Sequence, residues 1–150
     1  MIILIDTHSH LDAGEFNPDR DAVFERARAA GVAIQIVPSV TQASFDAVAA
    51  ACHRYPGCLP AWGLHPIYIQ VHHDGHLAAL RAQIESWRPV AVGEIGLDLF
   101  MPELDFATQE RFYVDQLKIA RDFDLPVLLH CRRANDHILK HLRRVGVKGG

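Results

Sequence analysis

The sequence predicts an α/β fold in which parallel β-strands alternate with α-helices. Short, continuous apolar runs alternate with longer segments whose apolar residues recur at helical spacing. The strand–helix order occurs five times, and no low-complexity or Ser-rich linker interrupts it. Continuous apolar runs are typical of strands that are covered on both faces, as in a parallel sheet. We therefore expect one globular domain, or part of one.

The five apolar runs are the predicted strands. They cover approximately Ile2–Ile5, Ala33–Val37, Leu59–Gly63, Val90–Gly93 and Val127–His130.

Five helices are predicted to follow these strands. The first covers about Asp19–Ala30 and ends at Gly31. Thr41 can cap the second, which ends before Pro56. Apolar residues at helical spacing mark the other three: Leu77, Leu80, Ile84 and Trp87; Phe112, Tyr113, Leu117, Ile119, Ala120 and Phe123; and Ile138, Leu139, Leu142 and Val145.

Composition narrows the class of protein. The 150 residues are 49% apolar and 22% charged, which is enough apolar material for a buried core. The net charge of -3 argues against a protein that coats nucleic acid, because that mode of binding needs a basic face. The first apolar run stops at Asp6, too early for a secretory signal, and no run is long enough to cross a membrane.

The cysteines and histidines suggest a compartment and a chemistry. Cys52, Cys58 and Cys131 follow no zinc-ribbon or redox spacing, so we expect a reduced, cytoplasmic chain. Ten histidines exceed the needs of packing, and histidine is the commonest metal ligand among side chains.

Polar residues follow the predicted strands. His8 and His10 come after the first strand, and in extended backbone two residues spaced by one point to the same side, so both imidazoles can reach one ion. Three further strands end in Gly63-Leu64-His65-Pro66, in Gly93-Glu94-Ile95-Gly96-Leu97-Asp98 and in His130-Cys131-Arg132-Arg133.

The positions of these polar groups help to distinguish two parallel-sheet architectures, the open doubly wound sheet and the TIM (β/α)8 barrel. Both collect functional groups at the carboxyl ends of strands, but a barrel draws them from many strands around one axis. Four of the five predicted strands end in candidate ligands here, which favours the barrel. Imidazole and carboxylate ligands suit Zn²⁺, Mn²⁺ or a related divalent ion better than calcium.

The ordered motifs HSH, GLHP, GEIGLD and LLHCRR resemble the TatD family of metal-dependent hydrolases, and GEIGLDLF is similar to its YjjV-type branch. The resemblance covers essentially the whole chain. An HxH motif alone is weak evidence, but four motifs in this order are highly specific. The resemblance implies a TIM barrel with a two-metal site and with deoxyribonuclease or phosphoesterase activity.

Residue by residue, the resemblance implies that His8 and His10 hold one metal, that His130 holds a second, and that Glu94 bridges the two and is the central catalytic residue. A carboxylate can bridge because its two oxygens each serve one cation across about 3.5–4 Å. The expected cofactors are two divalent ions, Zn, Mn or Mg. They would activate a hydroxide that attacks a phosphoester.

The resemblance also implies substrate-binding residues. His65 would contact substrate phosphate or support a metal ligand, and Arg132 would steady an anionic oxygen. Asp98, which follows in the same motif as Glu94, is expected to orient a ligand. The expected partner is a phosphoester substrate, with DNA ends as one candidate, and no membrane.

A TIM barrel needs eight units and about 250 residues, whereas this sequence holds five units. We therefore interpret residues 1–150 as the N-terminal part of a single TIM-barrel metallohydrolase domain. The resemblance implies further ligands on strands six and eight, from the rest of the chain or from a second polypeptide. An open five-stranded piece leaves strand edges unpartnered, so we expect it to be poorly stable alone.

Two other functions remain open at this point. An amidohydrolase acting on a cyclic amide or lactone would share the barrel and the HxH strand, although many of those enzymes use a modified lysine where this chain has Glu94. A truncated, metal-binding remnant would not catalyse at all. The segment His72–His76 is expected to be a solvated loop, His141 a surface residue, and Cys131 a small core residue.

Overall fold

The computed structural model describes residues 3–150 as five parallel strands, each followed by a helix. The strands are β1 (Leu4–Asp6), β2 (Val32–Pro38), β3 (Cys58–Trp62), β4 (Ala91–Asp98) and β5 (Val127–Arg132). The helices are α1 (Arg20–Ala29), α2 (Phe45–Arg54), α3 (Asp74–Ser86), α4 (Phe106–Asp122) and α5 (Asn135–Val145). Three short 3₁₀ helices are η1 (Gly14–Phe16), η2 (Gln42–Ser44) and η3 (Pro66–Val71). The predicted number and order of elements are confirmed.

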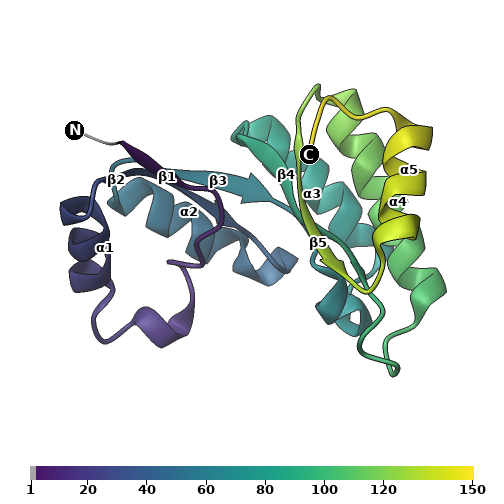
Figure 1. Ribbon diagram of the computed structural model, residues 1–150, viewed down its shortest axis with the longest axis horizontal. Helices are drawn as coiled ribbons and strands as arrows, with labels where there is room; N and C mark the ends of the chain where they lie inside the picture. Colours follow the sequence, from purple (N-terminus) through teal and green to yellow (C-terminus); the bar gives the residue numbers. More distant parts are fainter. Residues whose placement is uncertain (1–2) are drawn as a thin grey trace.

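The order of the strands confirms the barrel architecture. Neighbours in the sheet are neighbours in sequence, β1-β2-β3-β4-β5, and every pairing is parallel. A doubly wound sheet would reverse its strand order at a switch point, and this sheet does not. The strands curl into a half-barrel, with the helices outside it (Figure 1).

β1 and β4 differ most from the predicted strands, whereas β2, β3 and β5 differ by one or two residues at their ends. β1 is Leu4–Asp6 rather than Ile2–Ile5, and Ile2 lies outside the described residues. β4 was predicted to end at Gly93, but it continues to Asp98, and all of its residues are buried. Gly96 permits the extension, because its φ of 149° and its contact with the His130 carbonyl leave no space for a Cβ. Gly93 and Gly96, which were expected to lie at or beyond the end of this strand, are therefore part of it.

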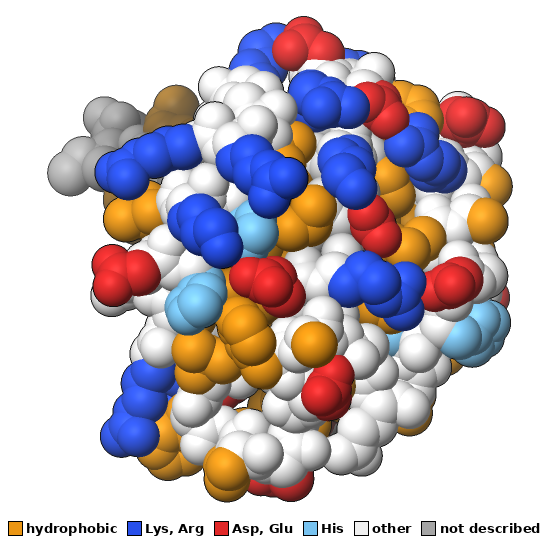
Figure 2. Space-filling view, turned by 90° about the vertical axis from the view of Figure 1, so that its right-hand side faces the viewer, with side chains coloured by type: hydrophobic (Ala, Val, Ile, Leu, Met, Phe, Trp, Pro, Cys, Tyr) orange, Lys and Arg blue, Asp and Glu red, His pale blue; other side chains and the backbone are white. Residues whose placement is uncertain are grey.

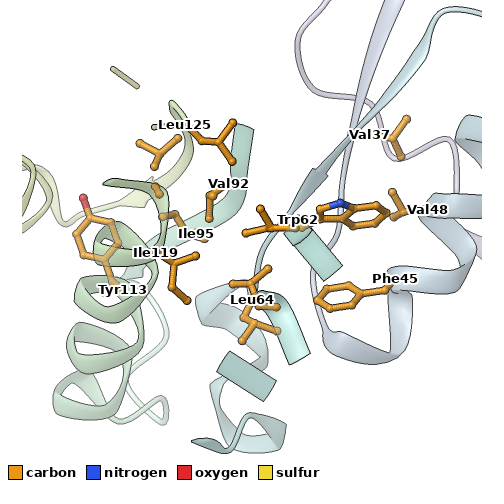
Figure 3. Close-up of a cluster of buried hydrophobic side chains, with 14 of the residues drawn as sticks. Val37, Phe45, Val48, Trp62, Leu64, Val92, Ile95, Tyr113, Ile119 and Leu125 are labelled. Atoms are coloured by element: carbon orange, nitrogen blue, oxygen red, sulfur yellow. The ribbon is translucent and has the colours of Figure 1, made fainter. Parts of the chain in front are cut away.

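The core fills the layer between the sheet and the helices (Figure 3). One side of it packs Trp62 of β3 against Phe45 and Val48 of α2, and Trp62 donates a hydrogen bond to the Trp87 carbonyl at 2.9 Å. The other side packs Ile95 of β4 near Tyr113 of α4. Fully burying a large apolar side chain contributes roughly 1.5–3 kcal/mol, so these contacts fix how α2 and α4 sit on the sheet.

The outer surface around α4 and α5 carries both signs of charge. Figure 2 shows Lys and Arg side chains spread over this face with Asp and Glu among them. Helix α4 contributes ion pairs such as Lys118–Asp115 at 2.8 Å and Arg81–Asp122 at 2.6 Å. Within residues 3–150, no helix has the length and apolar character that a membrane span requires.

Candidate metal centre

The histidine pair after β1 brings two ring nitrogens together. The Nε2 atoms of His8 and His10 lie 3.1 Å apart. The backbone N–H of His8 donates to the Asp6 carboxylate at 3.1 Å, which fixes the turn at the end of the strand. The alternation expected for extended backbone is therefore present, and both imidazoles face the same point.

Glu94 lies between this pair and a second pair of histidines. Its Oε2 atom is 3.0 Å from His8 Nε2 and 3.6 Å from His10 Nε2. Its Oε1 atom is 3.3 Å from His65 Nε2 and 3.3 Å from His130 Nδ1. Each carboxylate oxygen thus faces a different pair of imidazoles, as a carboxylate that bridges two cations would.

Two groups of side chains could therefore hold a metal ion: His8, His10 and Glu94, and His65, Glu94 and His130. In each group the ligand atoms lie within 4.8 Å of one another. Imidazole nitrogens and carboxylate oxygens bind Zn²⁺ and similar ions at about 2.0–2.2 Å. The atoms that bind one ion therefore lie close to one another, as the atoms of each group do. The donor set fits a divalent metal at each group. His65, which was expected to contact substrate phosphate or to support a metal ligand, lies among these ligand atoms.

The charge state of Glu94 suits this role. Its side chain is only 9% exposed, and burial alone would raise its pKa. Hydrogen bonds with His10, His130 and His65 outweigh burial and hold the pKa of Glu94 far below its ordinary value. The hydrogen bond with Glu94 raises the pKa of His10 against the opposing effect of burial. Glu94 is therefore an ionised carboxylate, the form that binds a cation.

Asp98 holds the far side of the His130 ring. Its Oδ2 atom is 2.9 Å from His130 Nε2, and its side chain is completely buried. Its Oδ1 atom accepts a hydrogen bond from the Phe100 N–H at 2.9 Å. A carboxylate behind a metal-binding imidazole fixes the orientation of the ring, which is the role expected for Asp98.

Arg132 lies at the rim, where it can meet an anion. One guanidinium nitrogen is 3.9 Å from Asp98 Oδ2, and the guanidinium carbon lies 3.6 Å from the centroid of the Phe100 ring. The Arg133 guanidinium also stacks on Phe100, at 4.7 Å. About half of the Arg132 side chain stays exposed, at 46%.

A family profile described as TatD related DNase matches residues 5–150. The chain belongs to the TatD family. The metal-dependent hydrolase YjjV of Escherichia coli K12, itself uncharacterised, is 43% identical over 143 residues, covering 93% of this chain and 55% of that protein. The 3'-5' ssDNA/RNA exonuclease TatD of Cronobacter sakazakii is 35% identical over 136 residues, covering 91% of this chain and 52% of that protein.

Solved TatD-family structures have the same fold. The crystal structure of Escherichia coli YjjV superposes with a TM-score of 0.91 at 41% identity, covering 96% of this chain and 56% of that one. A TatD-family hydrolase from Entamoeba histolytica gives a TM-score of 0.87 at 24% identity, covering 98% and 56%. The chain thus spans about half the length of the TatD relatives that it matches.

Sequence reasoning missed the residues that hold the TatD-family motifs in place. Two glutamines of α4, Gln109 and Gln116, are each 1% exposed. The Gln116 amide accepts from the Leu64 N–H at 2.8 Å and donates to the Leu64 carbonyl at 3.1 Å, directly before His65. Gln109 makes the same pair of bonds with the backbone of Asp98, at 2.8 and 3.1 Å. Polar residues seven apart on an otherwise apolar helix face were the available signal.

Ser39 at the end of β2 is a further residue that the motifs did not reveal. Its hydroxyl donates to the Gly63 carbonyl at 2.9 Å and accepts from the Gly63 N–H at 2.8 Å. Its carbonyl accepts from the Glu94 N–H at 3.2 Å. One buried serine therefore connects the ends of β2, β3 and β4, and with them the backbone that carries Glu94.

Three predictions about other residues were wrong. His72 is buried rather than solvated, with Nε2 lying 3.0 Å from the His65 carbonyl, so it supports the loop after β3. His141 is buried and bonded to Glu110 at 2.8 Å, because α5 packs that side of its surface on α4. Cys131 is exposed rather than in the core, and its thiol donates to the Asn135 side chain at 2.9 Å.

Proposed function

We propose that this protein is a hydrolase of phosphodiester bonds that uses two divalent metal ions, in the manner of a TatD-like deoxyribonuclease or phosphoesterase. The observation that carries the proposal is the position of Glu94, whose two carboxylate oxygens face two different histidine pairs. The Cronobacter sakazakii relative is named a 3'-5' ssDNA/RNA exonuclease, which supports a phosphodiester as the bond that is broken.

Each residue of the centre has a proposed role. His8, His10 and Glu94 Oε2 would hold one ion, and His65, His130 and Glu94 Oε1 would hold the other, as Zn²⁺, Mn²⁺ or Mg²⁺. Such ions would lower the pKa of an attacking water and neutralise charge on the phosphate oxygens. Asp98 keeps the His130 ring oriented, and Arg132 at the rim binds an anionic oxygen of the substrate.

Metal content tests the ligand assignment. Glu94→Gln keeps the shape of the side chain and removes its charge, so the variant should lose bound metal and phosphodiester hydrolysis together. Glu103→Gln, an exposed glutamate with no ion pair among residues 3–150, is the matched control and should keep both. Metal analysis of the purified proteins should give two ions per chain for the wild type. Two ions retained by Glu94→Gln would refute the bridging role.

Substrate class needs a separate comparison. A phosphodiester and a cyclic amide should be offered side by side, with Mn²⁺ or Zn²⁺ supplied. Turnover of the phosphodiester alone supports the proposal. Turnover of the cyclic amide alone would replace it with an amidohydrolase function, and turnover of neither with two ions bound would leave a metal-binding protein.

A further inference from the structure

A cleft lies directly beside the first histidine pair. We name it the Tyr68 cleft; it has a volume of about 460 Å³, and its walls include His10, Asp12, Glu15, Val40, Ala47 and Tyr68. It forms where the segments after β1, β2 and β3 meet. His10 is the only residue that it shares with the two candidate metal groups among residues 3–150. A substrate group attached to a phosphate held at the metal centre would therefore have this space next to it.

Tyr68 offers an aromatic surface in this cleft. It lies in η3, three residues after His65, and its ring centroid is 6.0 Å from that of His65 in an edge-on arrangement. Although it is a large apolar side chain close to the centre, Tyr68 is 45% exposed. Exposed aromatic rings beside a phosphate site are platforms on which planar groups stack, and base–aromatic stacking tolerates any base.

The charges around the centre favour a neutral group in the cleft. Asp12 and Glu15 stand in its wall, so a second phosphate there would meet like charge. Carboxylates accept hydrogen bonds, so they suit a group that carries N–H or O–H donors. Arg20 donates to the backbone carbonyls of Asp12 and Ala13 at 3.1 and 2.8 Å, but it does not itself line the cleft. Arg132 contacts Asp98, behind His130.

We propose that the Tyr68 cleft binds the nucleobase of the nucleotide next to the phosphodiester that is hydrolysed, with the base stacked on Tyr68. This inference rests on the proposed function and extends it by assigning a binding place to the base of the substrate. It makes Tyr68 a specificity-determining residue that contacts substrate.

The test compares two short single-stranded DNA oligomers, one with all bases present and one with an abasic tetrahydrofuran nucleotide at the terminus that is cleaved. Tyr68→Ala should lower kcat/KM on the base-bearing oligomer by roughly tenfold, the scale of one stacked base, and leave the abasic oligomer unaffected. Tyr68→Phe should keep the preference. The dissociation constant of the base-bearing oligomer, measured by fluorescence anisotropy without added metal, should rise by a similar factor in Tyr68→Ala.

Val71→Ala is the matched control, because Val71 is an exposed apolar residue of η3 that does not line the cleft. This variant should have the wild-type kcat/KM on both oligomers. If Tyr68→Ala lowers kcat/KM equally on both oligomers, or on neither, this inference is overturned and the proposed function still stands. Failure of the wild type to cleave any phosphodiester would overturn the proposed function, and the inference with it.

Discussion

At the scale of single residues, the centre depends on groups that do not themselves face the proposed ions. Asp98 is the clearest case, because it is completely buried and its one partner ring is His130. Burial would raise the pKa of Asp98, but the hydrogen bond with His130 and that from the Phe100 N–H hold it below its ordinary value. The carboxylate therefore stays charged and keeps the ring in one orientation.

Replacing Asp98 tests this orienting role. Asp98→Asn preserves the shape but weakens the bond to His130, so metal affinity at the His65–His130 group should fall by about 10–100-fold. Calorimetric titration of the metal-free protein should show one weakened site and one unchanged site. Asp46 is an exposed aspartate of α2, and the control variant Asp46→Asn should bind metal at both sites with the affinity of the wild type. Equal affinities at both sites of the Asp98 variant would contradict the role.

The sequence alone was enough to name most residues of the candidate site. The HxH spacing and the strand ends pointed to His8, His10, Glu94 and His130, because strand geometry and a specific motif order constrain them locally. The place of His65 was harder to predict, because its nearness to His130 depends on two strands 65 residues apart in sequence. Its ring nitrogen lies 3.1 Å from His130 Nδ1 only once β3, β4 and β5 are side by side.

At the scale of elements, helix α4 acts as a support for two strand ends. Gln109 and Gln116 each bind both backbone groups of one residue, Asp98 and Leu64 respectively. Since these backbone groups are buried, no other partner is available for them if an amide is removed. The helix thereby sets the positions of Asp98 and, through Leu64, of His65.

Gln116→Leu should reveal this support as a loss of stability. It leaves the N–H and C=O of Leu64 buried without partners, and each such group costs roughly 1–3 kcal/mol. We expect the free energy of unfolding, measured in urea, to fall by about 2–6 kcal/mol. Gln70→Leu, at an exposed position of η3, should stay within about 0.5 kcal/mol of the wild type. A small change in Gln116→Leu would show that water replaces the amide.

The contact between α4 and α5 predicts a pH dependence. The hydrogen bond with His141 lowers the pKa of Glu110 below its ordinary value of 4.5. A carboxyl whose pKa falls on folding stabilises the fold above its unfolded pKa, and this stabilisation is lost as pH falls through the lowered pKa. Because Glu110 is partly exposed, the effect should be under about 1 kcal/mol.

Glu110→Gln provides the comparison for this effect. The variant should unfold more easily than the wild type at neutral pH, and the difference should vanish in acid, below the lowered pKa of Glu110. Urea unfolding at a series of pH values measures it. A difference that grows in acid would have the wrong sign and would exclude the carboxylate as its source.

The boundaries of elements were less predictable than their number. Helical spacing located all five helices, because amphipathic periodicity is a local property of sequence. The length of β4 does not follow from local sequence. Gly93 and Gly96 suggested the end of a strand, but the pairing of Ile95 with Leu129 and of Gly96 with His130 continues it. Partner strands, rather than propensity, decided that boundary.

At the scale of the whole molecule, the exposed apolar residues in β1 and directly before it are unusual for a folded surface. Ile3, Leu4 and Ile5 are 71%, 45% and 56% exposed, and β1 pairs only with β2 among the described residues. The TatD relatives are about twice as long as the region matched here. We propose that further barrel strands, from the same or a second polypeptide, cover these residues in the active protein.

A polypeptide of residues 1–150 expressed by itself tests this proposal. Its exposed apolar edge strand should make it self-associate and bind a hydrophobic dye, because unpaired apolar edges recruit other chains. The same residues within a complete barrel should do neither. Sedimentation and dye fluorescence measure both properties, and Ile5→Lys should reduce self-association of the short polypeptide while destabilising the complete barrel. A monomeric 1–150 polypeptide that unfolds cooperatively and binds no dye would contradict the need for covering strands.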